Sequence, residues 1–143
     1  MRAMIGPMTL VLLLAGCTTV RQDFRGSAPD AVWAALVAAA ETPEYGDELP
    51  VSERWTVLEN EVWADEASGR IEIHRRLVRV VHHPRSEPHR QDRTWKFRID
   101  FKAGEKPPTA IFVSRGLAVP IQAVVEGERY FADVKTLLAR PLP

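Results

Sequence analysis

Cysteine is nearly absent from this sequence: Cys17 is the only one among 143 residues. An intrachain disulfide is therefore excluded, so the fold depends on an apolar core. The chain is 45% hydrophobic and 27% charged, which is ordinary for a globular protein. Its length supports one domain rather than two.

The sequence also lacks an excess of charge of either sign, because 19 lysines and arginines balance 19 aspartates and glutamates. This balance gives no electrostatic drive toward nucleic acid, so nucleic acid is not an expected partner. Beyond the first seventeen residues, no apolar run approaches the ~18 residues of a membrane-spanning helix. The chain contains no internal repeat and no low-complexity segment.

Sequence motifs for nucleophilic catalysis are missing as well. The serines stand in turn, cap or exposed settings, and none lies in a nucleophile elbow: Ser27, Ser52, Ser68, Ser86 and Ser114. Glu59 and Glu61 form a carboxylate pair two residues apart. Ion pairing with arginines and a histidine on a neighbouring strand explains this pair more simply than acid–base catalysis does. The sequence therefore predicts neither an enzyme nor a bound cofactor.

The start of the chain has the organisation of a secretory signal. Arg2 supplies the positive charge, and residues 4–14 form an apolar segment that is too short to cross a membrane. Residues 14–17, Leu-Ala-Gly-Cys, resemble the lipobox of bacterial lipoproteins, in which small residues admit the signal peptidase and the cysteine receives the lipid. The alternative is an ordinary signal peptide with a chance cysteine.

The resemblance implies that residues 1–16 are removed and that Cys17 carries a permanent membrane anchor. Thr18 stands where an aspartate commonly retains lipoproteins in the inner membrane. For a Gram-negative host, we therefore expect the outer membrane, facing the periplasm. Residues 17–27 are predicted to be the lipidated N-terminus and a polar tether that reaches on the order of 35 Å. Residues 28–143 form the globular domain, which is not assigned to a family.

Hydrophobic periodicity predicts a helix at each end of this domain. Ser27 is the expected N-cap of the first helix, with Pro29 in the first turn, and this helix ends at residue 40 or 41. The second helix covers about residues 120–139, and Gly127 in its apolar stripe permits close approach to a sheet. Its polar side carries Glu126, Arg129, Asp133 and Thr136.

Between the helices, the pattern predicts strands at residues 55–64, 70–81, 93–102 and 109–115. A four-residue loop at 66–69 places Val62 opposite Ile73 and Leu58 opposite Leu77. This register collects apolar side chains on one face, whereas a one-residue slip would mix charged and apolar side chains on both.

The same register places charged residues on the other face, where Glu59 lies opposite Arg76. Trp55 and Val57 would also fall on this charged face, which indicates a bulge or a covered strand end. Short hairpin loops and one apolar face per element predict an α+β fold in two layers. We expect a four-stranded antiparallel meander with an N-terminal and a C-terminal helix packed on one face.

Histidines cluster near the middle of the chain: His82, His83 and His89 surround Glu87, and His74 lies on the preceding strand. A zinc site needs three or four donors that converge on one point. Adjacent histidines on a strand point to opposite faces, and the neighbouring arginines would repel a cation. The sequence therefore predicts a polar hairpin tip and no metal site.

Charge is unevenly distributed, because residues 41–66 are acidic and residues 70–102 are basic. The simplest interpretation is that the two segments neutralise each other across the hairpin. The functional interpretation is a basic outer face of the sheet, formed by Arg76, Lys96, Arg98 and Lys102. Such a face suits anionic lipid headgroups, polysaccharide or an acidic protein.

These observations favour a non-catalytic envelope lipoprotein that is anchored at Cys17 and contacts another envelope component. The alternative is a binding module for an anionic envelope ligand on the basic face. The sequence leaves the partner, the ligand and the oligomeric state open.

Overall fold

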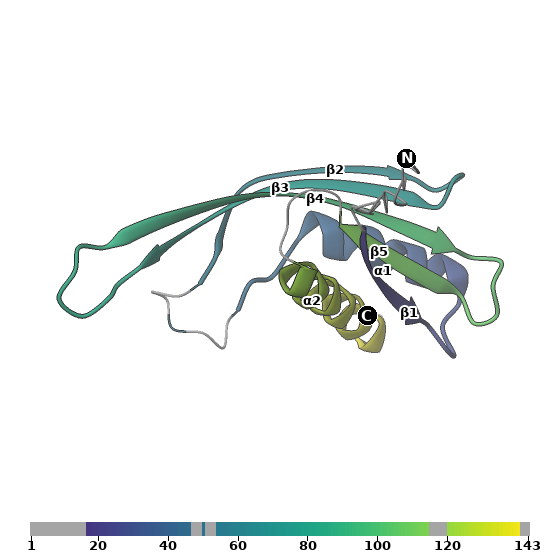
Figure 1. The fold of residues 1–143 in the computed structure, drawn as a ribbon. Coiled ribbons are helices and arrows are strands. Elements are labelled where there is room, and N and C mark those ends of the chain that lie inside the picture. Colours follow the sequence, from purple (N-terminus) through teal and green to yellow (C-terminus); the bar gives the residue numbers. More distant parts are fainter. Residues whose placement is uncertain (1–16, 47–49, 51–53, 115–119, 141–143) are drawn as a thin grey trace, which may run out of the picture.

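The computed structural model describes residues 17–46, 50, 54–114 and 120–140. Within these residues, five antiparallel strands form one sheet in the order β1-β5-β4-β3-β2, and both helices cover the same face of it (Figure 1). The elements are β1 Thr18–Asp23, α1 Pro29–Glu41, β2 Thr56–Asp65, β3 Arg70–Val81, β4 His89–Lys102, β5 Thr109–Ser114 and α2 Pro120–Ala139. The predicted α+β class and the meander from β2 to β5 are confirmed.

The prediction of four strands is wrong, because β1 adds a fifth strand beside β5. This strand occupies most of the segment that we expected to be a tether, and Val20 pairs there with Phe112. Directly after it, Phe24 is buried and its N–H donates to the carbonyl of Pro108 at 2.9 Å. Val20 is the only aliphatic or aromatic side chain of β1, so no periodicity revealed the strand. Backbone pairing to β5 holds this edge strand in place.

The first helix begins one residue later than predicted. Ala28, not Ser27, is the N-cap, and its carbonyl accepts the N–H of Val32 at 3.0 Å. Pro29 takes the first helical position, where its missing N–H costs nothing, so the proline fixes the start without a side-chain cap. The buried face of α1 comprises Val32, Ala35, Leu36, Ala39 and Ala40.

The core lies between the sheet and the two helices. Its members that are almost completely buried come from β3, β4, β5 and both helices and include Ile71, Ile73, Ile99, Phe112, Leu36, Val134, Phe131 and Tyr130. The hydroxyl of Tyr130 donates to the carbonyl of Leu36 at 2.6 Å, so a buried hydrogen bond joins the helices. No helix in the described ranges has the length and apolar content to cross a membrane.

Gly127 of α2 lies against the new edge strand. A Cβ atom at this position would come within 2.8 Å of Val20 Cγ2 and 3.0 Å of Phe112 Cδ1. The predicted close approach of the helix to the sheet is therefore confirmed. Because Val20 belongs to β1, this contact also makes β1 part of the domain.

The hairpin of β2 and β3 has the predicted register at its closed end, where Val62 pairs with Ile73 and Glu59 with Arg76. The predicted irregularity is a bulge between Val57 and Glu59. The bulge places Val57, rather than Leu58, opposite Leu77, so that pairing was predicted wrongly. Leu58 is left 46% exposed.

Strands β3 and β4 continue past the rest of the sheet as a two-stranded arm (Figure 1). Pairing of β2 ends at Thr56 with Val78, and pairing of β5 with β4 ends at Ser114 with Phe97. Residues 79–91, which we call the arm, pair only with each other. Strand β4 accordingly starts at His89, four residues before the predicted start.

Candidate functional site

A pocket of about 400 Å³ lies between the first turns of α2 and the base of the arm. Tyr45, Trp55 and Trp95 supply aromatic walls, and Val125 at its edge is 57% exposed. Trp95 shares the inward face of β4 with the buried Phe97, so the pocket opens on the face of the sheet that carries the helices. We call it the aromatic pocket.

Arg93 is the least satisfied cation of the aromatic pocket. Its guanidinium lies 5.1 Å from the ring centroid of Trp55 and 5.9 Å from that of Trp95. One nitrogen donates to Gln122 Oε1 at 2.7 Å. No carboxylate of the described residues forms an ion pair with Arg93, so its charge is met only by an amide and by ring faces.

Arg79 repeats this arrangement at the base of the arm. Its guanidinium lies 4.5 Å from the centroid of Trp55, and its Nε donates to Gln91 Oε1 at 2.7 Å. Within the described ranges Arg79 also forms no ion pair with a carboxylate. Trp55 therefore lies between two guanidinium groups whose charges remain available to an anion.

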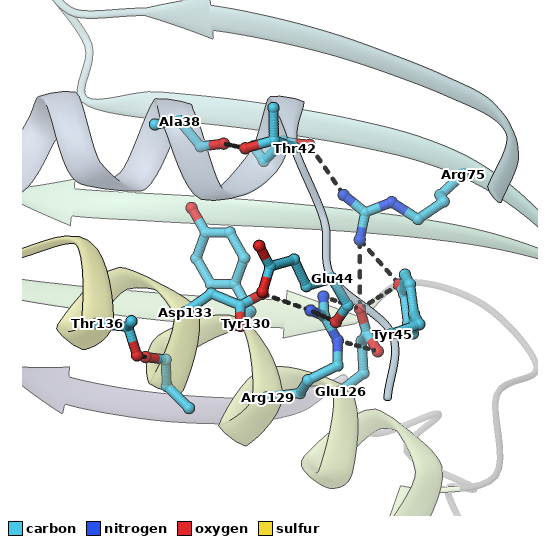
Figure 2. A network of polar contacts seen from close by, with 12 residues as sticks. Ala38, Thr42, Glu44, Tyr45, Arg75, Glu126, Arg129, Tyr130, Asp133 and Thr136 are labelled. Carbon is cyan, nitrogen blue, oxygen red and sulfur yellow. Dashed lines mark hydrogen bonds and ion pairs between the residues drawn. The ribbon is translucent and has the colours of Figure 1, made fainter. Parts of the chain in front are cut away.

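The floor of the pocket is a polar network around the buried Arg75 (Figure 2). Arg75 is 1% exposed, and one terminal nitrogen donates to the Tyr45 hydroxyl at 2.8 Å and approaches Glu126 Oε1 at 3.4 Å. Its other nitrogens donate to Asn60 Oδ1 at 2.8 Å and to the carbonyl of Ala40 at 2.9 Å. Arg75 thereby donates a hydrogen bond to a carbonyl in the last turn of α1 that has no partner within the helix, and it connects this turn to β2 and α2.

Arg129 completes this network from α2. It forms a bidentate pair with Glu126 at 2.8 and 3.1 Å and reaches Asp133 Oδ2 at 2.6 Å (Figure 2). Its guanidinium also lies 4.1 Å from the ring centroid of Tyr45 and donates to the carbonyl of Glu44 at 2.9 Å. We call Tyr45, Arg75, Glu126, Arg129 and Asp133 the Arg75 network.

The Arg75 network is electrically balanced, since two guanidinium groups face two carboxylates. Burial raises the pKa of Tyr45, and Glu126 raises it further, so the hydroxyl stays protonated and donates to Glu126 at 2.7 Å. Burial on its own would lower the pKa of Arg129. The hydrogen bond to Glu126 and the negative charge of Glu126 have the larger effect, so the pKa of Arg129 is raised. Burial also raises the pKa of Asp133, and Arg129 offsets part of this effect.

Every buried side-chain nitrogen or oxygen among the described residues has a hydrogen-bond partner. The polar groups of the Arg75 network are thus committed to one another. The network positions Tyr45 and the first turns of α2 as pocket walls, and the cations available for a ligand lie above it at Arg79 and Arg93.

The predicted basic face does exist as a set of residues on the outer side of the sheet, but most of its charge is neutralised. The pairs are Arg76 with Glu59 at 3.5 Å and Asp92 at 3.6 Å, Arg98 with Asp100 at 2.9 Å, and Lys102 with Glu105 at 3.7 Å. Of the four predicted residues, Lys96 alone forms no ion pair within the described chain. Of these pairs, Arg76 with Glu59 joins the basic segment to the acidic one, whereas the other carboxylates lie outside residues 41–66. Anion binding on this face stays a prediction.

The histidines are not brought together. No group of three or more histidine, cysteine, aspartate or glutamate residues in the described ranges could hold a metal ion. His74 packs against Trp63 on the outer face, with 4.7 Å between ring centroids. His82 and His83 lie in the tip of the hairpin between β3 and β4, and His89 begins β4.

Cys17, the predicted lipid attachment site, is exposed and directly precedes β1. The predicted signal peptide, residues 1–16, lies outside the described residues. A lipid on Cys17 would therefore have no tether between itself and the sheet.

Sequence reasoning missed the pocket and its floor. The sequence did contain one indication of the network, because Arg75 occupies a core-facing position between Ile73 and Leu77 on β3. A charged side chain on the core-facing side of a strand requires a buried partner of opposite charge. That partner is Glu126, which the helical pattern had assigned to the polar side of α2 but which is 3% exposed.

No protein-family model matches the sequence, and no curated protein matches it either. The structure is similar to the crystal structure of protein MLL2253 from Mesorhizobium loti, with a TM-score of 0.53 and 14% identity over 90% of this chain and 100% of that one. Protein CV1439 from Chromobacterium violaceum gives a TM-score of 0.41 and 15% identity over 88% of this chain and 99% of that one. At 14% identity, the similarity to the Mesorhizobium loti protein concerns the fold alone.

Proposed function

We propose that this protein is a lipoprotein of the bacterial envelope that is acylated on Cys17 and binds a small amphipathic anion without catalysing a reaction. The signal and lipobox pattern of the first seventeen residues support the anchor. The observation that carries the binding function is the aromatic pocket with the guanidinium of Arg93, which forms no ion pair with a carboxylate of the described residues. The location that the anchor favours is the outer membrane, facing the periplasm.

The chemistry of the aromatic pocket defines the ligand class. Two tryptophans, a tyrosine and Val125 offer apolar contact, so the ligand needs an apolar portion. Arg93 has no carboxylate partner among the described residues, so a carboxylate or phosphate on the ligand would replace water at this guanidinium. A volume of about 400 Å³ lies at the small end of the range for ligand pockets.

The absence of a catalytic step is part of this proposal. General acid–base catalysis needs a titratable group that is free to exchange a proton with a substrate. Glu126, the carboxylate among the described lining residues, is held by Arg129 and Arg75 in the Arg75 network. The aromatic pocket therefore supports binding in preference to turnover.

Binding is tested by titrating the purified full-length protein with decanoate and, as an uncharged match, decanol, with tryptophan fluorescence as the readout. We expect decanoate to bind at least about tenfold more tightly than decanol, since a charge-assisted hydrogen bond is worth about 1.5–3 kcal/mol. Arg93→Gln should remove this preference. Lys96→Gln, which removes an equal charge from the opposite face of the same strand, should leave it unchanged. Equal effects of the two substitutions would exclude the pocket.

The anchor is tested separately by metabolic labelling with a fatty-acid analogue in a bacterial host. We expect label on the wild-type protein and none on Cys17→Ser, which should instead appear in the soluble fraction. An unlabelled wild-type protein would refute acylation and leave the pocket titration unaffected.

A further inference from the structure

The absence of a tether restricts how the domain can sit on a membrane. Cys17 lies one residue before β1, and β1 is fixed to β5 from Thr18 onward. If Cys17 is acylated, its lipid enters the bilayer at the edge of the folded domain. The end of the domain that carries Cys17 must then touch the membrane surface.

The register of the sheet places Cys17 at the same end as the aromatic pocket. Thr18 pairs with Ser114, and Ser114 pairs with Phe97 on β4. Measured along the strand direction, Cys17 therefore lies at the height of Lys96, between Phe97 and Trp95 of β4, which is two strands away from β1. With about 4.8 Å between strands, the backbones of Cys17 and Trp95 are roughly 10 Å apart.

Helix α2 gives the same orientation independently. Gly127 packs on Val20, whereas Leu138 near the other end of the helix lies with Asp23 around a separate depression. The helix therefore runs alongside β1, and its first turns, with Gln122 and Val125, lie toward Cys17.

The side chains at this end have the chemistry of a membrane interface. Trp55 and Trp95 suit the interface between headgroups and acyl chains, and Val125 presents an exposed apolar side chain. Arg79 and Arg93, stacked on Trp55, match the negative charge of anionic headgroups. On the outer face of the sheet, Arg76, Arg98 and Lys102 instead form ion pairs with carboxylates, and Lys96 is the one cation of the predicted basic face without an ion pair among the described residues.

We infer that the aromatic pocket opens onto the bilayer that holds the lipid anchor and takes the headgroup region of an anionic phospholipid from it. This inference rests on the proposed acylation of Cys17 and on the proposed pocket function, and it names the ligand and its source. The phosphate pairs with Arg93, and the glycerol and first methylenes contact the tryptophans.

Tryptophan quenching by brominated phospholipids tests the orientation, because the chain has four tryptophans and only two line the pocket. The mature lipidated protein, residues 17–143, is reconstituted into vesicles of phosphatidylcholine that contain brominated phosphatidylglycerol. We expect Trp55→Phe and Trp95→Phe to remove most of the quenching. Trp63→Phe is the matched control, since Trp63 is 49% exposed on the outer face, and it should leave the quenching unchanged. Quenching that depends on Trp63 instead would overturn the inference.

Competition by water-soluble dihexanoyl phosphatidylglycerol distinguishes failure of this inference from failure of the proposed function. We expect this lipid to compete with decanoate in the full-length protein. Dihexanoyl phosphatidylcholine, whose choline cation would face the guanidinium groups of Arg79 and Arg93, and inorganic phosphate, which has no apolar portion, should compete about tenfold more weakly. Competition by phosphate alone, with no effect of the acyl chains, would mean that a free anion is the ligand and would overturn the lipid source. If decanoate itself fails to bind, the proposed function fails as well, whereas binding of decanoate without competition refutes only this inference.

Discussion

Arg75 and Arg93 lie on the same face of neighbouring strands, yet they have opposite surroundings. Arg75 pairs in register with Trp95, two residues from Arg93, and all of its nitrogens donate to protein groups. Arg93 bonds one amide and otherwise faces tryptophan rings. An arginine that is buried with all of its N–H groups bonded is part of the scaffold, whereas an arginine that is only partly hydrogen-bonded beside a pocket is available for a ligand.

The largest expected effect is the loss of Arg75. Arg75→Met should lower the free energy of unfolding by about 3 kcal/mol, the low end for breaking a buried ion pair, because Arg129 still faces Glu126. Chemical denaturation measures the change. Adding Glu126→Gln should recover part of the loss, because the uncompensated charge is then removed. A cost no larger than that of Arg93→Met would break the distinction between the two arginines.

A second prediction concerns how closely the scaffold is packed. Gly127→Ala should lower the free energy of unfolding by about 1 kcal/mol, because overpacking of about 1–3 kcal/mol exceeds the gain in helix propensity of up to about 1 kcal/mol. Val20→Ala in the same chain should restore stability by making room. Gly104→Ala serves as the control, since nothing lies within 4 Å of its added Cβ. A Gly127→Ala variant as stable as wild type would contradict the contact between α2 and β1.

A third prediction uses the only two tyrosines, Tyr45 and Tyr130. Burial raises the pKa of both above the ordinary 10.0, so the folded protein keeps protons that the unfolded chain releases. Stability is therefore full below pH 10 and falls as the pH rises beyond it. Tyrosinate absorbance should stay flat in the folded protein and rise only together with unfolding. A tyrosine that titrates near pH 10 while circular dichroism is unchanged would refute the enclosure of that side chain.

The smallest expected effect is that of Arg93 on stability. Arg93→Gln should change the free energy of unfolding by no more than about 0.5 kcal/mol, because the side chain is half-buried and pairs with no carboxylate of the described chain. The same denaturation experiment as for Arg75→Met gives the comparison. A loss above 2 kcal/mol, on the scale of about 1–3 kcal/mol for an unsatisfied buried group, would place Arg93 in the scaffold.

Much of the fold could be predicted from the sequence because it is written in local patterns. Alternation along β3 and β4 and the short loop at 66–69 determined the register of Val62 with Ile73. Helical spacing placed α2 from Pro120 to Ala139. The candidate site could not be predicted in this way, since Tyr45 lies in an irregular segment and Trp55 directly precedes β2.

Local sequence patterns are enough to predict the antiparallel meander, the two helices and the close approach at Gly127, because each depends on neighbours within a few residues. The strand Thr18–Asp23 depends on long-range packing, since an edge strand with little apolar content is held by backbone pairing to a segment far along the chain. Long-range packing also determines which charges are buried. Arg75 and Glu126 are 51 residues apart, and only the packing of α2 on the sheet brings them together.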